Sequence, residues 1–253
     1  MKRPPPPPTV NLADLFELVV RAVPRRVALT TPAASFTYGQ LDGRANQLAR
    51  LLQLKGIGPG DHVGIVLPTG LEHIEGVLAT LKLRAHPVAV SPELSDATIT
   101  RVLDECGARG VLHRREDLER VGAMGVALEE LNFFVVVEDA SGLECTLPNA
   151  VFYEEGLASY EADMEFGARS GDDLHVTYAV GDDGALGRTE TRHEEVVRAL
   201  RGGAALARPE ALLDELVAAS TTTAPDRPMA ETGGLGVLRA LLRGATVELA
   251  GPY

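Results

Sequence analysis

The chain has 253 residues and a formal net charge of -12, with 45% hydrophobic and 24% charged residues. This length allows one large or two small domains with a sizeable core, and the composition is that of an ordinary soluble globular protein. The negative charge argues against nucleic-acid binding, which needs clustered Lys and Arg. We therefore interpret the acidic balance as a contribution to solubility.

The ends of the chain and its cysteines carry no targeting or metal signal. The N-terminus lacks the apolar stretch of a secretory signal, and no apolar run reaches bilayer-spanning length, so we expect no membrane contact. Residues 1–10 predict a disordered proline-rich arm, with an SH3-type ligand as the less favoured alternative, and residues 11–253 a single domain. Cys106 and Cys145 lie in no CxxC motif. Neither a disulfide framework nor a zinc site is predicted, and a cytoplasmic location fits.

Helical and strand patterns alternate through the first half of the chain. We expect helices over residues 12–23, 38–55, 71–84 and 95–106, and strands over 27–30, 35–37, 62–67, 87–90, 110–113 and 133–137. Repeated strand-helix-strand units of this length need crossover connections, which give a parallel sheet covered by helices on both faces. The predicted fold class is therefore α/β with a mainly parallel sheet.

The second half is less regular. Residues 138–160 have weak periodicity and predict a long surface connection. Residues 172–178 predict a short strand that runs through a glycine-containing turn into a helix over 191–201. Beyond this helix we expect helices over 211–219 and 235–243, a breaker-rich linker over 221–229 and a closing strand over 245–249.

The glycine-containing turn is a candidate phosphate-binding loop. Backbone N–H groups and the positive end of a helix can hold a phosphate, and the turn offers Gly181 and Gly184. It also carries Asp182 and Asp183, which repel a polyphosphate unless a metal ion lies between them. We favour solvated acids over a magnesium site. With Arg188, these four residues form a degenerate cofactor loop, and we predict no catalytic residue and no metal ligand.

The six histidines form no motif. His175 falls on a predicted strand and His193 near a helix start, where core or capping roles are the usual ones. The other four are His62, His73, His86 and His113. They are too dispersed along the sequence to predict a metal cluster.

Several segments together resemble a known family. They are SFTYGQLD at 35–42, ANQLA at 45–49, GIGPGDHVGIVLP at 56–68, PVAVSPEL at 87–94 and GAR at 107–109. They look like the opening of the adenylate-forming superfamily, which comprises acyl-CoA synthetases, luciferases and adenylation domains of nonribosomal peptide synthetases. Residues 172–178 and 192–195 are similar to the strand before and the helix after that family's phosphate-binding loop. The resemblance runs in order from about residue 11 to 249 and implies the N-terminal part of that fold.

The resemblance makes the departures in the loop visible. The family loop is rich in Ser, Thr and Gly and ends in Pro-Lys-Gly, and these groups hold the phosphates of ATP. Here the hydroxyl positions are taken by Ala179 and the two aspartates, the proline by Leu186 and the lysine by Gly187. Arg188, one position further on, is an alternative source of the cation. Because two acids have been added, the loop has changed the sign of its charge.

The family members are also longer than this chain. Their later part holds the rest of the acyl pocket, a magnesium ligand, nucleotide contacts and a mobile domain with the catalytic lysine. The resemblance therefore implies a truncated pseudoenzyme without cofactor that acts by binding, as a homo-oligomer or with a full-length adenylating enzyme or carrier protein. The alternative is one half of a split acid-thiol ligase that uses ATP and magnesium, with Arg188 replacing the lysine. The acyl substrate stays open.

Overall fold

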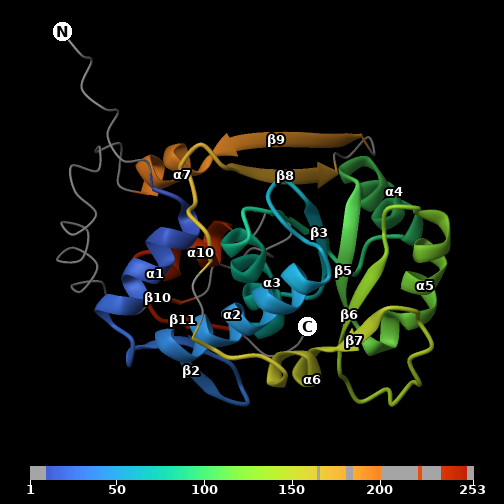
Figure 1. Ribbon diagram of the computed structural model, residues 1–253, viewed down its shortest axis with the longest axis horizontal. Helices are drawn as coiled ribbons and strands as arrows, with labels where there is room; N and C mark the ends of the chain where they lie inside the picture. Colours follow the sequence, from blue (N-terminus) through green and yellow to red (C-terminus); the bar gives the residue numbers. More distant parts are fainter. Residues whose placement is uncertain (1–9, 164–165, 181–184, 201–221, 224–234, 250–253) are drawn as a thin grey trace, which may run out of the picture.

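A five-stranded, fully parallel sheet forms the centre of the computed structural model (Figure 1). The structure describes residues 10–163, 166–180, 185–200, 222–223 and 235–249. The sheet order is β4-β3-β5-β6-β7, with strands β3 (His62–Val66), β4 (His86–Ala89), β5 (Ala108–Arg114), β6 (Phe133–Val137) and β7 (Ala150–Phe152). No helix within these residues is both long and apolar enough to cross a bilayer.

Helices cover both faces of this sheet, as the crossover argument predicts. They are α1 (Leu12–Ala22), α2 (Tyr38–Leu54), α3 (Leu71–Lys82), α4 (Asp96–Cys106), α5 (Leu118–Ala127), which follows the 3-10 turn η1 (Arg115–Asp117), and α6 (Tyr153–Ala158). Alternate side chains of each strand point to opposite faces. Leu112 of β5 therefore joins the core beneath α1, α2 and α3, whereas Val111 joins a second core beneath α4 and α5. The α/β class is confirmed.

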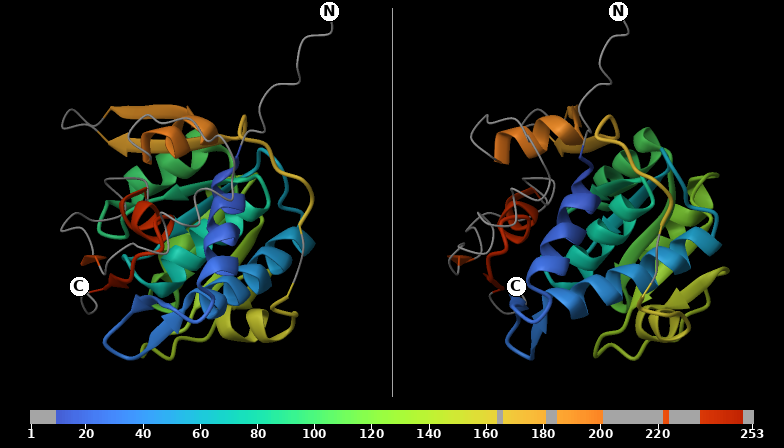
Figure 2. Two further views of the ribbon diagram at one scale, coloured as in Figure 1. Left: turned by 90° about the vertical axis from the view of Figure 1, so that its left-hand side faces the viewer. Right: turned by 60° about the vertical axis from the view of Figure 1, so that its left-hand side comes forward.

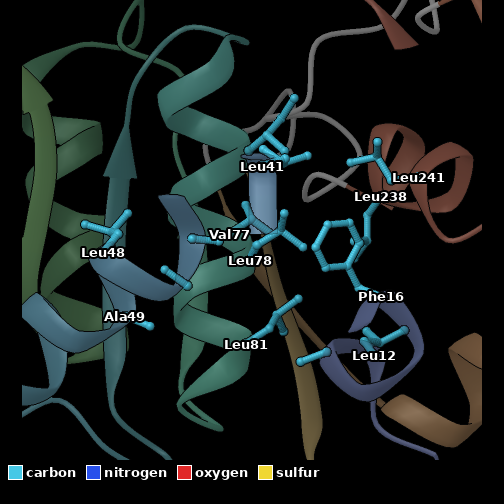
Figure 3. Packing of buried hydrophobic residues seen from close by; sticks show 14 of the residues in the cluster. Leu12, Phe16, Leu41, Leu48, Ala49, Val77, Leu78, Leu81, Leu238 and Leu241 are labelled. Atoms are coloured by element: carbon cyan, nitrogen blue, oxygen red, sulfur yellow. The ribbon is translucent and has the colours of Figure 1, made fainter. Parts of the chain in front are cut away.

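Helix α3 lies at the middle of the larger core (Figure 3). Its Val77 and Leu78 are at most 2% exposed and face Phe16 of α1. Leu238, on the later helix α10 (Leu235–Leu241), closes the same cluster. Full burial of one such side chain contributes about 1.5–3 kcal/mol. The cluster therefore joins the first and last helices of the described chain to the sheet.

A second sheet connects the two ends of the described chain. Its order is β10-β11-β1-β2, with β1 (Val27–Thr30), β2 (Ser35–Thr37), β10 (Thr222–Thr223) and β11 (Val247–Glu248). The predicted hairpin of β1 and β2 is confirmed, and β11 pairs with β1 in parallel. The hydroxyl of Tyr38 donates to the carbonyls of Leu241 and Ala245, at 3.0 and 2.7 Å. These bonds fix the C-terminal strand against the start of α2.

The prediction of a long surface connection over 138–160 is wrong in its second half. This stretch contains the edge strand β7 and the helix α6. Three and six residues are too few to show a period of two or of 3.6, so the pattern fails there. The helix is held instead by Tyr153, which is 1% exposed. Of the later predictions, the helix over 211–219 lies outside the described residues, as do the arm over 1–9 and most of the linker.

Candidate functional site

The candidate loop joins two long antiparallel strands. Strand β8 (Leu174–Val180) pairs with β9 (Leu186–Arg192), and helix α7 (His193–Leu200) follows at once. The register runs from Val180 opposite Leu186 to Leu174 opposite Arg192. Figures 1 and 2 show this hairpin at the end of the molecule away from α6. Residues 181–184, between the two strands in the sequence, lie outside the described residues.

The prediction that the turn leads directly into a helix is wrong. Strand β9 separates the tip from the first turn of α7, and seven residues of strand span about 20 Å at ~3.3 Å per residue. The field of a helix terminus falls off within about one turn. The positive end of α7 therefore does not contribute to a phosphate site at the tip. The alternation of Thr189 and Thr191 with charged residues was the available signal for a strand.

Of the five predicted loop residues, Arg188 is described, whereas Gly181, Asp182, Asp183 and Gly184 are not. Arg188 lies on β9 opposite Tyr178, with its side chain 51% exposed. A guanidinium nitrogen lies 2.5 Å from a carboxylate oxygen of Glu190, two positions along the same strand. The candidate replacement for the missing lysine is therefore already ion-paired.

Ion pairs fix the chain just before the hairpin. Asp173 accepts hydrogen bonds from the Arg84 guanidinium, the shortest at 2.7 Å, from Asn11 Nδ2 at 2.8 Å and from the Ser170 N–H at 3.2 Å. Burial by itself raises the pKa of Asp173, but the bonds from Arg84 and Ser170 lower it below its ordinary value. Arg169 in turn contacts Asp14 at 2.7 Å. The chain is thus anchored at Asp173, the residue before β8.

Four histidines meet at the base of the hairpin, and we call this group the histidine junction. They are His62, His86, His175 and His193, from β3, β4, β8 and α7. His62 and His86, which are distant in the sequence, lie side by side, because β3 and β4 place them opposite each other with ring centroids 4.8 Å apart. The core interpretation of His175 and His193 is confirmed, since they are 2% and 1% exposed. A histidine at the start of each of two adjacent parallel strands was the missed signal.

Burial sets the protonation of this junction. It lowers the pKa of His62, His175 and His193 to about 4 each, and it lowers that of His86. The four imidazoles are therefore neutral at pH 7. Within the described residues, no group of three or more His, Cys, Asp or Glu side chains is placed to hold a metal ion.

A buried acid with its own cation lies between α2, α3 and α6. Glu75 is fully buried, accepts from Arg44 Nε at 2.6 Å and from the Tyr153 hydroxyl at 2.5 Å. Burial raises the pKa of Glu75 to about 7, although both hydrogen bonds oppose the rise. Arg44 also contacts Glu154 at 2.6 Å. These groups join three helices far from the hairpin, so we assign them to structure.

The described residues present no activated nucleophile. Burial raises the pKa of the Cys106 thiol to about 12, which keeps it protonated and unreactive. Its Sγ donates to the carbonyl of Leu103 within α4. The described part of the chain offers a parallel sheet that carries the β8–β9 hairpin.

A parallel sheet covered on both faces, followed by an antiparallel hairpin and a helix, defines the N-terminal type of domain found in adenylate-forming enzymes. The family of AMP-binding enzymes matches residues 16–163, and the chain belongs to this family. The anthranilate CoA ligase AuaEII, solved with anthranoyl-AMP, has the same fold with a TM-score of 0.81 at 20% identity. That match covers 98% of this chain and 46% of the ligase.

Two curated relatives show where the sequence similarity lies. A 3-oxocholest-4-en-26-oate–CoA ligase of Rhodococcus rhodochrous is 33% identical over 194 residues, which cover 77% of this chain and 35% of the ligase. Surfactin synthase subunit 2 of Bacillus subtilis is 38% identical over 108 residues, 43% of this chain and 3% of that protein. The chain therefore spans about a third of the length of the CoA ligase that it matches.

Proposed function

We propose that this protein is a non-catalytic relative of the acyl-CoA ligases that acts by binding, either to itself or to an adenylating enzyme or carrier protein. The observation that carries the proposal is the chemistry of the hairpin. Gly187 stands where the family has its loop lysine, and Arg188 beside it is exposed and ion-paired with Glu190. Both free cysteines fit a cytoplasmic location, which we also propose.

The magnitudes favour loss of ATP binding. Separating an exposed pair such as Arg188 and Glu190 costs about 0.2–1 kcal/mol, so the pair alone is a small obstacle. Asp182 and Asp183 are the larger obstacle. Two unit charges about 4 Å apart near a protein surface interact by roughly 1–4 kcal/mol, so each carboxylate repels a phosphate by about that amount. A single surface arginine does not offset two such repulsions.

Isothermal titration calorimetry with ATP, with and without magnesium, tests this proposal. The wild-type chain should show no saturable heat up to millimolar ATP. A triple variant, Asp182→Ser with Asp183→Thr and Gly187→Lys, restores hydroxyls and lysine and should bind at least about tenfold more tightly, a gain of ~1.4 kcal/mol. Arg188→Ala is the matched control and should not change the wild-type result. Micromolar binding by the wild type that Arg188→Ala abolishes would refute the proposal.

Binding to a protein partner has its own measurement. Light scattering coupled to size exclusion at micromolar concentration should give a mass above the 26.8 kDa of one chain, or pull-down should recover an adenylating enzyme or a carrier protein. A monomer that recovers neither would contradict the binding role while leaving the calorimetric result intact.

One half of a split acid-thiol ligase is the second candidate. The parallel sheet and the similarity to a CoA ligase favour it. This chain matches about a third of that ligase. The chain mixed with the remaining portion of such a ligase should then catalyse acid-dependent exchange of pyrophosphate into ATP. Arg188→Ala should abolish the exchange, since this candidate needs Arg188 as the cation.

A further inference from the structure

The hairpin meets the sheet through ionisable rings that are uncharged. The Nδ1 of His86 lies 2.9 Å from the carbonyl of Leu174, the first residue of β8. The Tyr178 ring packs edge-on against His62, with centroids 6.5 Å apart. His193 Nδ1 accepts from the backbone N–H of Leu12, at 3.4 Å, which ties α7 to α1. Each of these contacts joins the hairpin or α7 to an element that precedes it by more than 80 residues.

The buried ring nitrogens of the junction lack partners that would stabilise a charge. Both nitrogens of His175 and the Nε2 atoms of His62 and His193 are buried without a hydrogen bond. A protonated imidazole needs an acceptor for each of its two N–H groups. Protonation of His175 in the docked hairpin would therefore leave two N–H donors without acceptors in the interior. The neutral ring leaves only one such donor.

The acids near the junction already form ion pairs with arginines. Asp61 faces His62, Asp173 faces His86 and His193, and Glu190 faces His86. Their ion pairs are Asp61 with Arg109 at 2.9 Å, Asp173 with Arg84 at 2.7 Å and Glu190 with Arg188 at 2.5 Å. Arg188 itself also faces His62 and His86 and opposes their protonation. A new positive charge at the junction thus meets neighbours that repel it and acids that are occupied.

A few apolar side chains also hold the hairpin and α7. Residues 187–190 of β9 are exposed, whereas Val176, Val196 and Val197 are buried, and Tyr178 and Leu186 pack half-buried against the smaller core. The main sheet, in contrast, has buried cores on both faces. Segments with few buried apolar contacts open at a lower free energy than the core. The unit of β8, β9 and α7 can therefore separate before the sheet unfolds.

We propose that the histidine junction is a proton-sensitive latch, and that its protonation in mild acid releases the β8–β9 hairpin and α7 from the parallel sheet. The latch sets whether β8, β9 and α7 are docked on the parallel sheet. This inference is independent of the proposed function, because it applies equally to a binding protein and to half of a ligase.

The size of the response follows from linkage. A histidine with a pKa of about 4 in the docked hairpin and an ordinary value of 6.5 in the released one favours release more strongly as the pH falls between these values. For His175 alone, lowering the pH from 7.5 to 5.0 multiplies the opening equilibrium constant by roughly thirtyfold. A second histidine that is freed in the same step increases the factor further.

Hydrogen exchange of the full chain, followed by mass spectrometry at pH 7.5 and 5.0, tests the latch. Exchange times are scaled for the intrinsic rate, and peptides from β5 and β6 report on the sheet. Protection in residues 174–192 should fall at least about tenfold at pH 5.0, while β5 and β6 stay protected. Constant protection in the hairpin, or a parallel fall in the sheet, would overturn the proposal.

His175→Leu removes one titrating ring whose nitrogens make no hydrogen bond, so the fold should tolerate it. It should make the fall in protection smaller by up to about thirtyfold, the share of His175, while the other three rings keep their contribution. His113→Asn is the control, because His113 is equally buried on β5 and should leave the fall unchanged. An unchanged fall in His175→Leu counts against the latch. NMR titration of the wild-type imidazoles provides a test without substitution. The four junction rings should titrate well below pH 6.5 or together with release of the hairpin. Ordinary titration near pH 6.5 without release would overturn the latch.

Discussion

Replacing Arg44 by Met should destabilise the protein in a way that depends on pH. Glu75 is 0% exposed and receives its charge-balancing hydrogen bonds from Arg44, at 2.6 and 3.3 Å. Removing one partner of a buried ion pair costs about 3–5 kcal/mol when the other stays charged. For a chain of this size each kcal/mol lowers Tm by roughly 2–4 °C, so a fall of about 6–20 °C is expected at pH 8.

The sign of the pH dependence follows from the pKa of Glu75. Its folded pKa, about 7, lies above the ordinary 4.5, and loss of Arg44 raises it further. A carboxyl whose folded pKa is raised stabilises the fold when protonated, and that contribution is lost as the pH rises through the folded value. The cost of Arg44→Met should therefore be several kcal/mol at pH 8 and fall to about 1–2 kcal/mol at pH 5, where Glu75 is neutral and still bonded to Tyr153.

Urea denaturation followed by far-UV circular dichroism measures these costs at the two pH values. Tryptophan fluorescence is not an option, because the chain has no tryptophan. The double variant Arg44→Met with Glu75→Gln is the matched control and should recover at least half of the loss at pH 8. A cost for Arg44→Met below 1 kcal/mol at pH 8, or one that is equal at both pH values, would refute the reasoning.

Three further substitutions test the packing and the caps, each by urea denaturation. A Cβ at position 110 would lie within the Phe133 ring, so Gly110→Ala should lower the free energy of unfolding by about 3 kcal/mol or prevent folding. A neutral result would show that β5 and β6 can move apart. Thr37→Ala removes the capping box of α2 and should cost about 1 kcal/mol, with Thr37→Ser as a near-neutral control. Asp173→Ala leaves Arg84 unpaired and should cost about 1–3 kcal/mol and speed amide exchange in β8; unchanged exchange would contradict the anchor.

The parallel sheet was predictable because its signals are local. Strand β6 (Phe133–Val137) is a continuous apolar run, and Asn11 is of a residue type that often caps a helix and does cap α1. The side-chain oxygen of Asn11 accepts a hydrogen bond from the Ala13 N–H at 2.8 Å, which confirms the cap. Where one residue type has one strong structural use, the sequence pattern and the structure agree.

The hairpin and the junction were not predictable in the same way. Strand β9 is interpreted as part of a turn, because its exposed residues show no alternation of apolar and polar side chains, and the alternating threonines are a weaker signal. His62 meets His86 through strand register, and His86 meets His175 through a long-range contact between β4 and β8; no local period encodes either. The sequence shows the changed residues Gly187 and Arg188 of the candidate loop directly. The salt bridge between Arg188 and Glu190 could not be predicted, because it depends on the strand conformation of β9.

The placement of the candidate loop has a consequence for how such a protein changes over generations. Residues 187–190 of β9 are exposed, and the apolar cores lie on the two faces of the parallel sheet. Substitutions at these four positions therefore disturb neither core. Strand β9 can exchange its polar side chains one by one while the domain keeps the same native state.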